Sequence, residues 1–160
     1  MTMAGISEEA LLAQEARFAR AFAAGDPALA RDLYQPEVVY VSPTVRLFEW
    51  PDRIDGIERT LEFIALTIRG CPDIRYEAME HAITPGADTA FVRVQFDWTQ
   101  GTQRLRATYV VIYRYRDGRI ARQELYYDPS GKLERLGTGE CVNRSLAYPA
   151  SPIQGDEMRL

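Results

Sequence analysis

The chain has 160 residues, of which 46% are hydrophobic and 26% charged, a composition typical of one globular domain. Its net charge of -4 argues against a nucleic-acid partner, because nucleic acids are bound by basic faces. No apolar run is long enough to cross a membrane and the first seven residues do not form a signal peptide, so we expect a cytoplasmic protein.

The first helix is predicted to begin after Ser7 and to end at Gly25. Ser7 precedes two glutamates, which favour the positive end of a helix dipole, and Gly25 supplies the left-handed conformation of a helix stop. Glu15 interrupts the apolar stripe of this helix. The stripe, at helical spacing, is Leu11, Glu15, Phe18 and Phe22.

Two further helices are expected before the chain turns to strands. Asp26 and Pro27 are typical of the start of a short second helix. A third helix is predicted to open with the capping-box pattern of Asp55 and Glu58, and to end at Gly70.

The pattern changes to alternation after residue 72, which indicates β-strands. Asp117-Gly118 is the strongest hairpin signal between them. With an earlier strand at 37–42, helices first and long strands last predict an α+β fold, a curved and mostly antiparallel sheet with helices on one face. The four predicted long strands are 74–84, 89–99, 104–115 and 119–128.

The end of the chain differs from the rest. Residues 138–160 lack periodicity and contain several glycines and prolines. We therefore expect one domain over residues 1–137, followed by an extended arm or a partly disordered tail.

Cysteine and histidine are scarce. Cys71 and Cys141 fit no metal or redox spacing, and His81 is the single histidine. A zinc or non-haem iron site needs more such ligands. We expect reduced, packed thiols and no metal.

Three motifs resemble the SnoaL-like branch of the NTF2-like superfamily. They are Ala-Ala-Gly-Asp-Pro at 23–27, Leu-Tyr-Gln-Pro-Glu-Val-Val-Tyr-Val-Ser-Pro at 33–43, and Tyr-Tyr-Asp-Pro-Ser-Gly-Lys-Leu-Glu-Arg-Leu-Gly at 126–137. The resemblance spans residues 8 to 137. It implies a cone-shaped sheet that holds a small ligand, with no cofactor. The group includes polyketide cyclases, epoxide hydrolases and ketosteroid isomerases, so the fold alone does not define the reaction.

The catalytic groups of ketosteroid isomerases are not kept at the matching positions. Their aspartate base falls on Ser42, their oxyanion-binding tyrosine on Phe18, and their second aspartate near Val111. The resemblance therefore does not imply ketosteroid isomerisation.

The groups of the epoxide hydrolases are kept in part. Tyr40 matches their tyrosine, whereas Ser42 replaces their asparagine. Their arginine and aspartate on a middle strand fall on Arg93 and Gln95. The acid that they share in position with polyketide cyclases falls on Leu125.

These matches predict which side chains line the cone, because alternate residues of a strand share a face. A lining of aromatic and aliphatic groups suits an apolar ligand that carries a carbonyl or hydroxyl. Trp50, near the mouth, could close over such a ligand or pack on a partner subunit. The predicted stripes are Val38, Tyr40 and Ser42; Phe91, Arg93, Gln95 and Asp97; Tyr109, Val111 and Tyr113; Gln123, Leu125 and Tyr127.

Four residues are the predicted catalytic groups. Arg93 and Tyr40 would polarise a substrate oxygen, and Asp97 or His81 would move a proton. Two alternatives stay open. Arg93 could form an ion pair with Asp97 or with an acid across a dimer interface, and His81 could face solvent.

We therefore expect a cofactor-independent isomerase, cyclase, dehydratase or hydrolase acting on an apolar or polycyclic molecule. The alternative is a non-catalytic ligand-binding or scaffolding protein, which the missing acids at Ser42 and Leu125 favour. We also expect a homodimer, because relatives commonly pair through the outer sheet face. The residues predicted on that face are Arg104, Arg106, Arg114, Arg122 and Glu124, with Val94, Phe96 and Ile112.

Overall fold

The computed structural model describes residues 5–43, 45, 49–127 and 134–135. The four long strands predicted after residue 72 are confirmed to within one residue at each end. The predicted arm, residues 138–160, lies outside the described residues. The elements are α1 (Glu8–Ala24), the 3-10 helix η1 (Pro27–Leu33), β1 (Tyr34–Val41), β2 (Arg53–Asp55), α2 (Ile57–Gly70), β3 (Arg75–Ile83), β4 (Thr89–Gln100), β5 (Gln103–Arg116), β6 (Arg119–Tyr127) and β7 (Glu134–Arg135).

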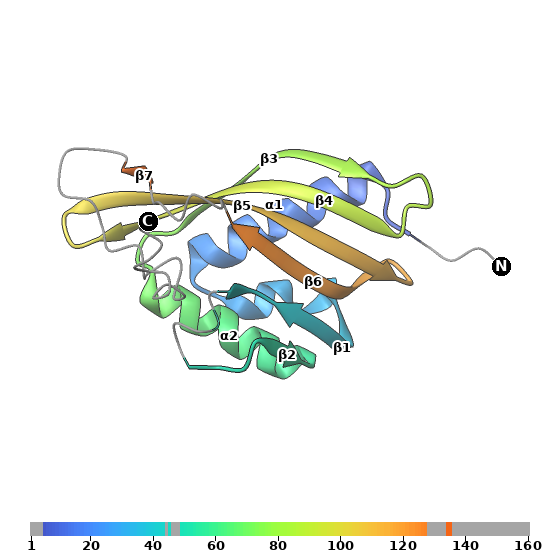
Figure 1. The fold of residues 1–160 in the computed structure, drawn as a ribbon, viewed down its shortest axis with the longest axis horizontal. Coiled ribbons are helices and arrows are strands. Elements are labelled where there is room, and N and C mark those ends of the chain that lie inside the picture. Colours follow the sequence, from blue (N-terminus) through green and yellow to red (C-terminus); the bar gives the residue numbers. More distant parts are fainter. Residues whose placement is uncertain (1–4, 44, 46–48, 128–133, 136–160) are drawn as a thin grey trace, which may run out of the picture.

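The strands form one strongly bent sheet in the order β2-β1-β6-β5-β4-β3, and β7 pairs with β5. All neighbours are antiparallel except β1 and β6. Figure 1 shows α1 running along the β3–β4 side and α2 along the β1–β2 side, both on the same face of the sheet. The α+β fold with a curved sheet is confirmed, and its core lies between this inner face and the helices.

The ends of α1 follow the sequence prediction. The Ser7 side chain accepts a hydrogen bond from the Ala10 backbone amide at 3.1 Å. Gly25 has a φ of 68°, in the left-handed region, where a Cβ is disfavoured. The Asp26 side chain accepts from the Ala28 amide at 3.0 Å and so caps η1.

The predicted capping box of the third helix is wrong. Gly56 is the N-cap of α2 and offers no side-chain cap. Asp55 belongs to β2 and accepts from Arg53 Nε at 2.8 Å. Glu58 instead accepts two hydrogen bonds from the Arg31 guanidinium, at 2.8 and 3.0 Å, because η1 lies beside α2. The acid pairs with a tertiary neighbour that local sequence does not reveal.

The predicted phase of β4 is also wrong. Val94 pairs with Tyr109 and Val92 with Val111, and all four side chains are buried on the inner face. The stripe Phe91, Arg93, Gln95 and Asp97 therefore lies on the outer face, whereas Val94 and Phe96, predicted there, point inward. The helices cover only one face, so the apolar set of each strand turns toward it.

Cys71 is a free, half-buried thiol, and burial raises its pKa to about 12. Cys141 lies outside the described residues. Within the ranges that the structure describes, neither α-helix is long and apolar enough to span a bilayer.

Candidate functional site

The inside of the cone is an aromatic chamber with little free space. Its cavity measures about 30 Å³, enough for about one water molecule. Five residues of the predicted stripes lie on its wall: Tyr40, Tyr109, Val111, Gln123 and Leu125. Phe18, at the position of the relatives' oxyanion-binding tyrosine, lies there too, and the other wall residues are Phe22, Tyr34, Ile64 and Tyr76.

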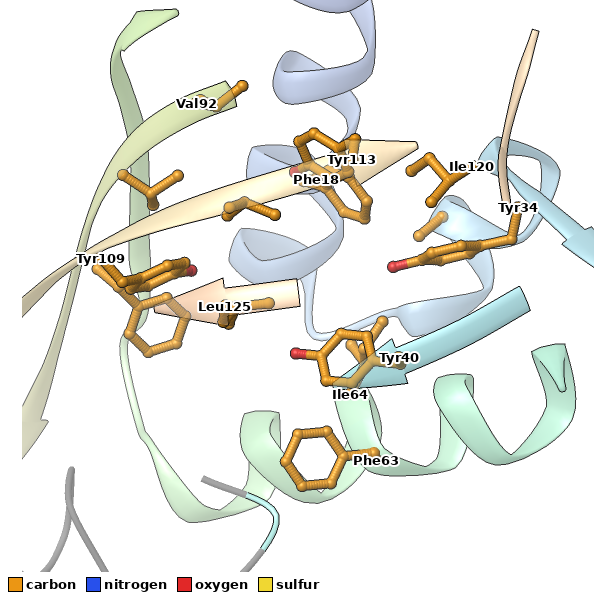
Figure 2. Close-up of a cluster of buried hydrophobic side chains, with 14 of the residues drawn as sticks. Phe18, Tyr34, Tyr40, Phe63, Ile64, Val92, Tyr109, Tyr113, Ile120 and Leu125 are labelled. Carbon is orange, nitrogen blue, oxygen red and sulfur yellow. The ribbon is translucent and has the colours of Figure 1, made fainter. Parts of the chain in front are cut away.

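Three phenol hydroxyls point into this chamber from different sides. Figure 2 shows those of Tyr34, Tyr40 and Tyr109 directed toward one shared space. Tyr34 donates to Gln123 Oε1 at 2.7 Å, and Tyr40 is hydrogen-bonded to the Ser42 side chain. Burial raises the pKa of all three tyrosines, so they stay protonated and can donate.

Tyr109 differs from the other two tyrosines. Its ring packs 4.9 Å from the Tyr127 ring and 6.3 Å from the Phe96 ring, measured between centroids. Among the residues that the structure describes, its hydroxyl has no hydrogen-bond partner. This donor is therefore available to an oxygen atom of a ligand.

Glu15, which was not predicted as a site residue, lies directly behind the chamber wall. The residue is 5% exposed. Its Oε1 accepts from the Tyr76 hydroxyl at 2.5 Å, and its Oε2 accepts from Gln14 Nε2 at 2.9 Å. The Tyr76 hydroxyl also lies 3.4 Å from that of Tyr113. Because Tyr76 lines the cavity, its phenol connects the carboxyl group to the chamber.

The environment of Glu15 changes its proton affinity. Burial raises the pKa of the carboxyl, and hydrogen bonds from Tyr76, Gln14 and Tyr113 oppose this in part, as does His81. A raised pKa moves a carboxyl toward the range in which it exchanges protons at physiological pH. The signal in the sequence was present, since Glu15 is the one acid in the apolar stripe of α1.

Arg93 lies outside the cone. Its side chain is 51% exposed, and its Nη1 donates to Glu80 Oε2 on β3 at 2.9 Å. The alternative of an ion pair with Asp97 is therefore wrong, because the register places Glu80 opposite Arg93. Gln95 also lies on this outer face, opposite Thr108.

The other two proton-transfer candidates also lie away from the chamber. Asp97 is buried on the outer face, where its Oδ1 accepts from Arg104 Nε at 2.6 Å and its Oδ2 lies 3.9 Å from Arg106. His81 Nε2 lies 3.3 Å from Glu8 Oε2, in a pair that joins β3 to α1. Neither residue lines the cavity.

The remaining predicted ligand-binding residues support the wall from behind. The Tyr113 ring stacks on Phe18 with centroids 6.2 Å apart. The Trp50 ring packs 5.7 Å from Phe63, and the Arg59 guanidinium lies 4.0 Å over it, so Trp50 contacts α2 rather than the cavity. Ser42 is hydrogen-bonded to the wall residue Tyr40, and the Tyr127 ring packs on that of Tyr109. Within the described part of the chain, no three His, Cys, Asp or Glu side chains gather as a metal site would require.

A sequence comparison matches this chain to one protein family. The model of the SnoaL-like domain aligns with residues 16–123, which is more than half of the chain. No curated protein matches the sequence.

Solved structures share the fold at low identity. A Catenulispora acidiphila protein of ketosteroid isomerase-like fold, in complex with trimethylamine, has a TM-score of 0.62 and 14% identity, with 78% of this chain and 88% of that chain covered. The epoxide hydrolase/cyclase-like enzyme SalBIII, with a role in pyran ring formation in salinomycin, has a TM-score of 0.62, 12% identity and coverages of 78% and 95%. TerC, co-crystallized with polyporic acid, has a TM-score of 0.62, 22% identity and coverages of 75% and 89%. Such identities establish the shared fold alone.

Proposed function

The chain belongs to the SnoaL-like domain family, and from this premise we propose that it binds one small, largely apolar molecule inside the cone and moves a proton on it with its own side chains. The ligand carries a carbonyl or hydroxyl oxygen. One observation carries the proposal. The available Tyr109 hydroxyl and the buried Glu15–Tyr76 pair adjoin the same chamber.

The proposed step is abstraction of a proton from the carbon next to a carbonyl. The carbon–hydrogen bond breaks and its proton passes to the Tyr76 oxygen, while the Tyr76 phenol proton passes to Glu15 Oε1. The electron pair left behind forms an enolate, whose oxygen accepts hydrogen bonds from Tyr109 and Tyr40. Donors fixed in a dry site stabilise such developing charge far better than water does. Return of the proton to another atom would complete an isomerisation or a cyclisation.

Solvent exchange of a bicyclic ketone tests this function. In deuterated buffer, the protein is expected to replace the protons beside the carbonyl of 2-tetralone faster than buffer alone, as followed by proton NMR. Tyr109→Phe removes one hydrogen bond to the ligand oxygen and should weaken binding about tenfold. Tyr126→Phe is the matched control, because Tyr126 is 55% exposed on the outer face.

A second function is favoured by other observations. The cavity is small, and Ser42 and Leu125 stand where relatives carry acids. A non-catalytic ligand-binding protein would bind 2-tetralone saturably with exchange no faster than in buffer, a result that excludes the enzyme. Absence of saturable binding would contradict both functions.

We also propose that two copies pair through the outer sheet face. No helix of the described chain covers this face, and it carries Phe91 and Tyr126 with 39% and 55% exposure. Phe91→Arg would place like charges across the interface and is expected to shift a dimer to a monomer in sedimentation velocity. Leu12→Arg is the control, because Leu12 is 49% exposed on α1. A wild-type chain that is monomeric at tens of micromolar would contradict the pairing.

A further inference from the structure

An open groove lies at the end of the cone where both α-helices terminate. Its volume is about 690 Å³, which falls in the range of about 300–1,000 Å³ found for small-molecule sites. The last residues of α1 are small, which leaves the groove hollow. Its lining includes Phe22, Ala24, Asp73, Arg75, Thr99 and Arg104.

Phe22 is the wall between this groove and the chamber. Among the described residues, it is the single side chain that lines both spaces. Its ring stacks on Tyr76 with centroids 5.5 Å apart and meets the edge of Phe96 at 5.4 Å. Phe22 is only half-buried, and it sits in the last turn of α1 beside the groove. A ligand that passed from the groove to the chamber would therefore have to displace this side chain.

Two arginines line the groove, and one of them has no partner of its own among the described residues. Arg75 is exposed and forms no hydrogen bond or ion pair with any residue that the structure describes. Arg104 is held in place, since its Nε donates to Asp97 at 2.6 Å and its Nη1 donates to Thr99 at 3.0 Å. Asp73 is the one acid on the wall of this groove within the described chain. Two guanidinium groups beside an apolar passage suit an anionic oxygen group.

We propose that the substrate is elongated and acidic, and that it occupies both spaces. Its apolar end, with the reacting oxygen, passes Phe22 into the chamber, and its carboxylate stays in the groove against Arg75 and Arg104. This inference rests on the proposed function of the chamber. It adds a second subsite next to the chamber.

Two matched probes separate the subsites. They are 4-hydroxybiphenyl, which has no charge, and 4′-hydroxybiphenyl-4-carboxylate, which adds the anionic end. Isothermal titration should show the carboxylate binding about tenfold more tightly, the effect of one partly exposed charged hydrogen bond. Arg75→Gln should remove this difference and leave 4-hydroxybiphenyl unchanged. Arg69→Gln is the control, because Arg69 is exposed at the end of α2 and does not line the groove.

Association rates of the two probes test whether the ligand passes Phe22. Phe22→Ala should speed the association of both probes in stopped-flow measurements, because the wall between groove and chamber is removed. Equal affinities of the two probes for the wild type, an Arg75→Gln variant that keeps the preference, or unchanged association rates would each overturn the second subsite. In those cases 4-hydroxybiphenyl still binds, so the proposed function stands. Failure of 4-hydroxybiphenyl itself to bind would contradict the proposed function as well.

Discussion

Replacing Glu15 by glutamine is expected to reduce ketone proton exchange at least about a hundredfold, the usual contribution of a positioned acid or base. The amide has nearly the shape of the carboxyl and can still accept from the Tyr76 hydroxyl. If the Gln14 amide turns over, its oxygen can accept from the amide nitrogen of the new glutamine. Its nitrogen then donates to the Tyr115 hydroxyl, which in the wild type donates to Gln14 Oε1 at 2.9 Å. The variant is therefore expected to fold and to lose the proton acceptor alone.

The same substitution is expected to stabilise the protein at neutral pH. Burial raises the pKa of Glu15 above its ordinary value of 4.5, so the folded state binds more protons than the unfolded state above that pH. Stability then falls as the pH rises from 4.5 toward the folded pKa. The amide does not titrate. The difference in melting temperature between Glu15→Gln and the wild type should therefore increase in favour of the variant as the pH increases through this window.

Two measurements check these expectations together. Melting curves from pH 4 to 8 give the stability difference, and the NMR assay gives the exchange rate. Glu9→Gln is the matched control, because Glu9 is exposed on the same helix; it should leave the exchange rate unchanged and lower the melting temperature only slightly, through the lost charge near the helix N-terminus. If Glu15→Gln exchanged ketone protons at the wild-type rate, the Glu15 carboxyl would have a structural role only.

Phe63→Ala is expected to lower the free energy of unfolding by about 3–5 kcal/mol, as large-to-small changes in a core do. Phe63 is 1% exposed on α2. Its ring lies 5.6 Å from that of Tyr40 and 5.7 Å from that of Trp50, and Figure 2 shows it on the side of Tyr40 that faces α2. The cavity left by the ring would also free Tyr40 to move and so weaken ligand binding.

Urea denaturation followed by tryptophan fluorescence measures this loss. Leu12→Ala is a matched control, because Leu12 is 49% exposed on α1 and its truncation leaves no buried cavity. It should cost less than about 1 kcal/mol. A loss below that value for Phe63→Ala would mean that α2 does not form part of the cooperative core.

In β4, the alternation of apolar and polar residues predicts correctly which side chains are buried. Its own alternation places Ala90, Val92, Val94 and Phe96 on one face, and the structure buries that set. The opposite phase, taken from the match of Arg93 to a relative's arginine, put charged residues inside. When sequence similarity is low, the alternation within a strand predicts its buried face better than residue-by-residue matching to a relative does. The reason is that burial of the apolar side chains determines which face of the strand turns inward.

By itself, the sequence determined the ends of α1, the four long strands and the α+β class. Caps, turns and alternation act over a few residues, so they can be read locally. The sequence also showed Glu15 as the one acid in the apolar stripe of α1. Only the tertiary structure decided that Glu15 meets Tyr76 from β3, that Glu80 rather than Asp97 pairs with Arg93, and that Phe22 separates two spaces. Those contacts join separate elements, and strand register and helix packing set them.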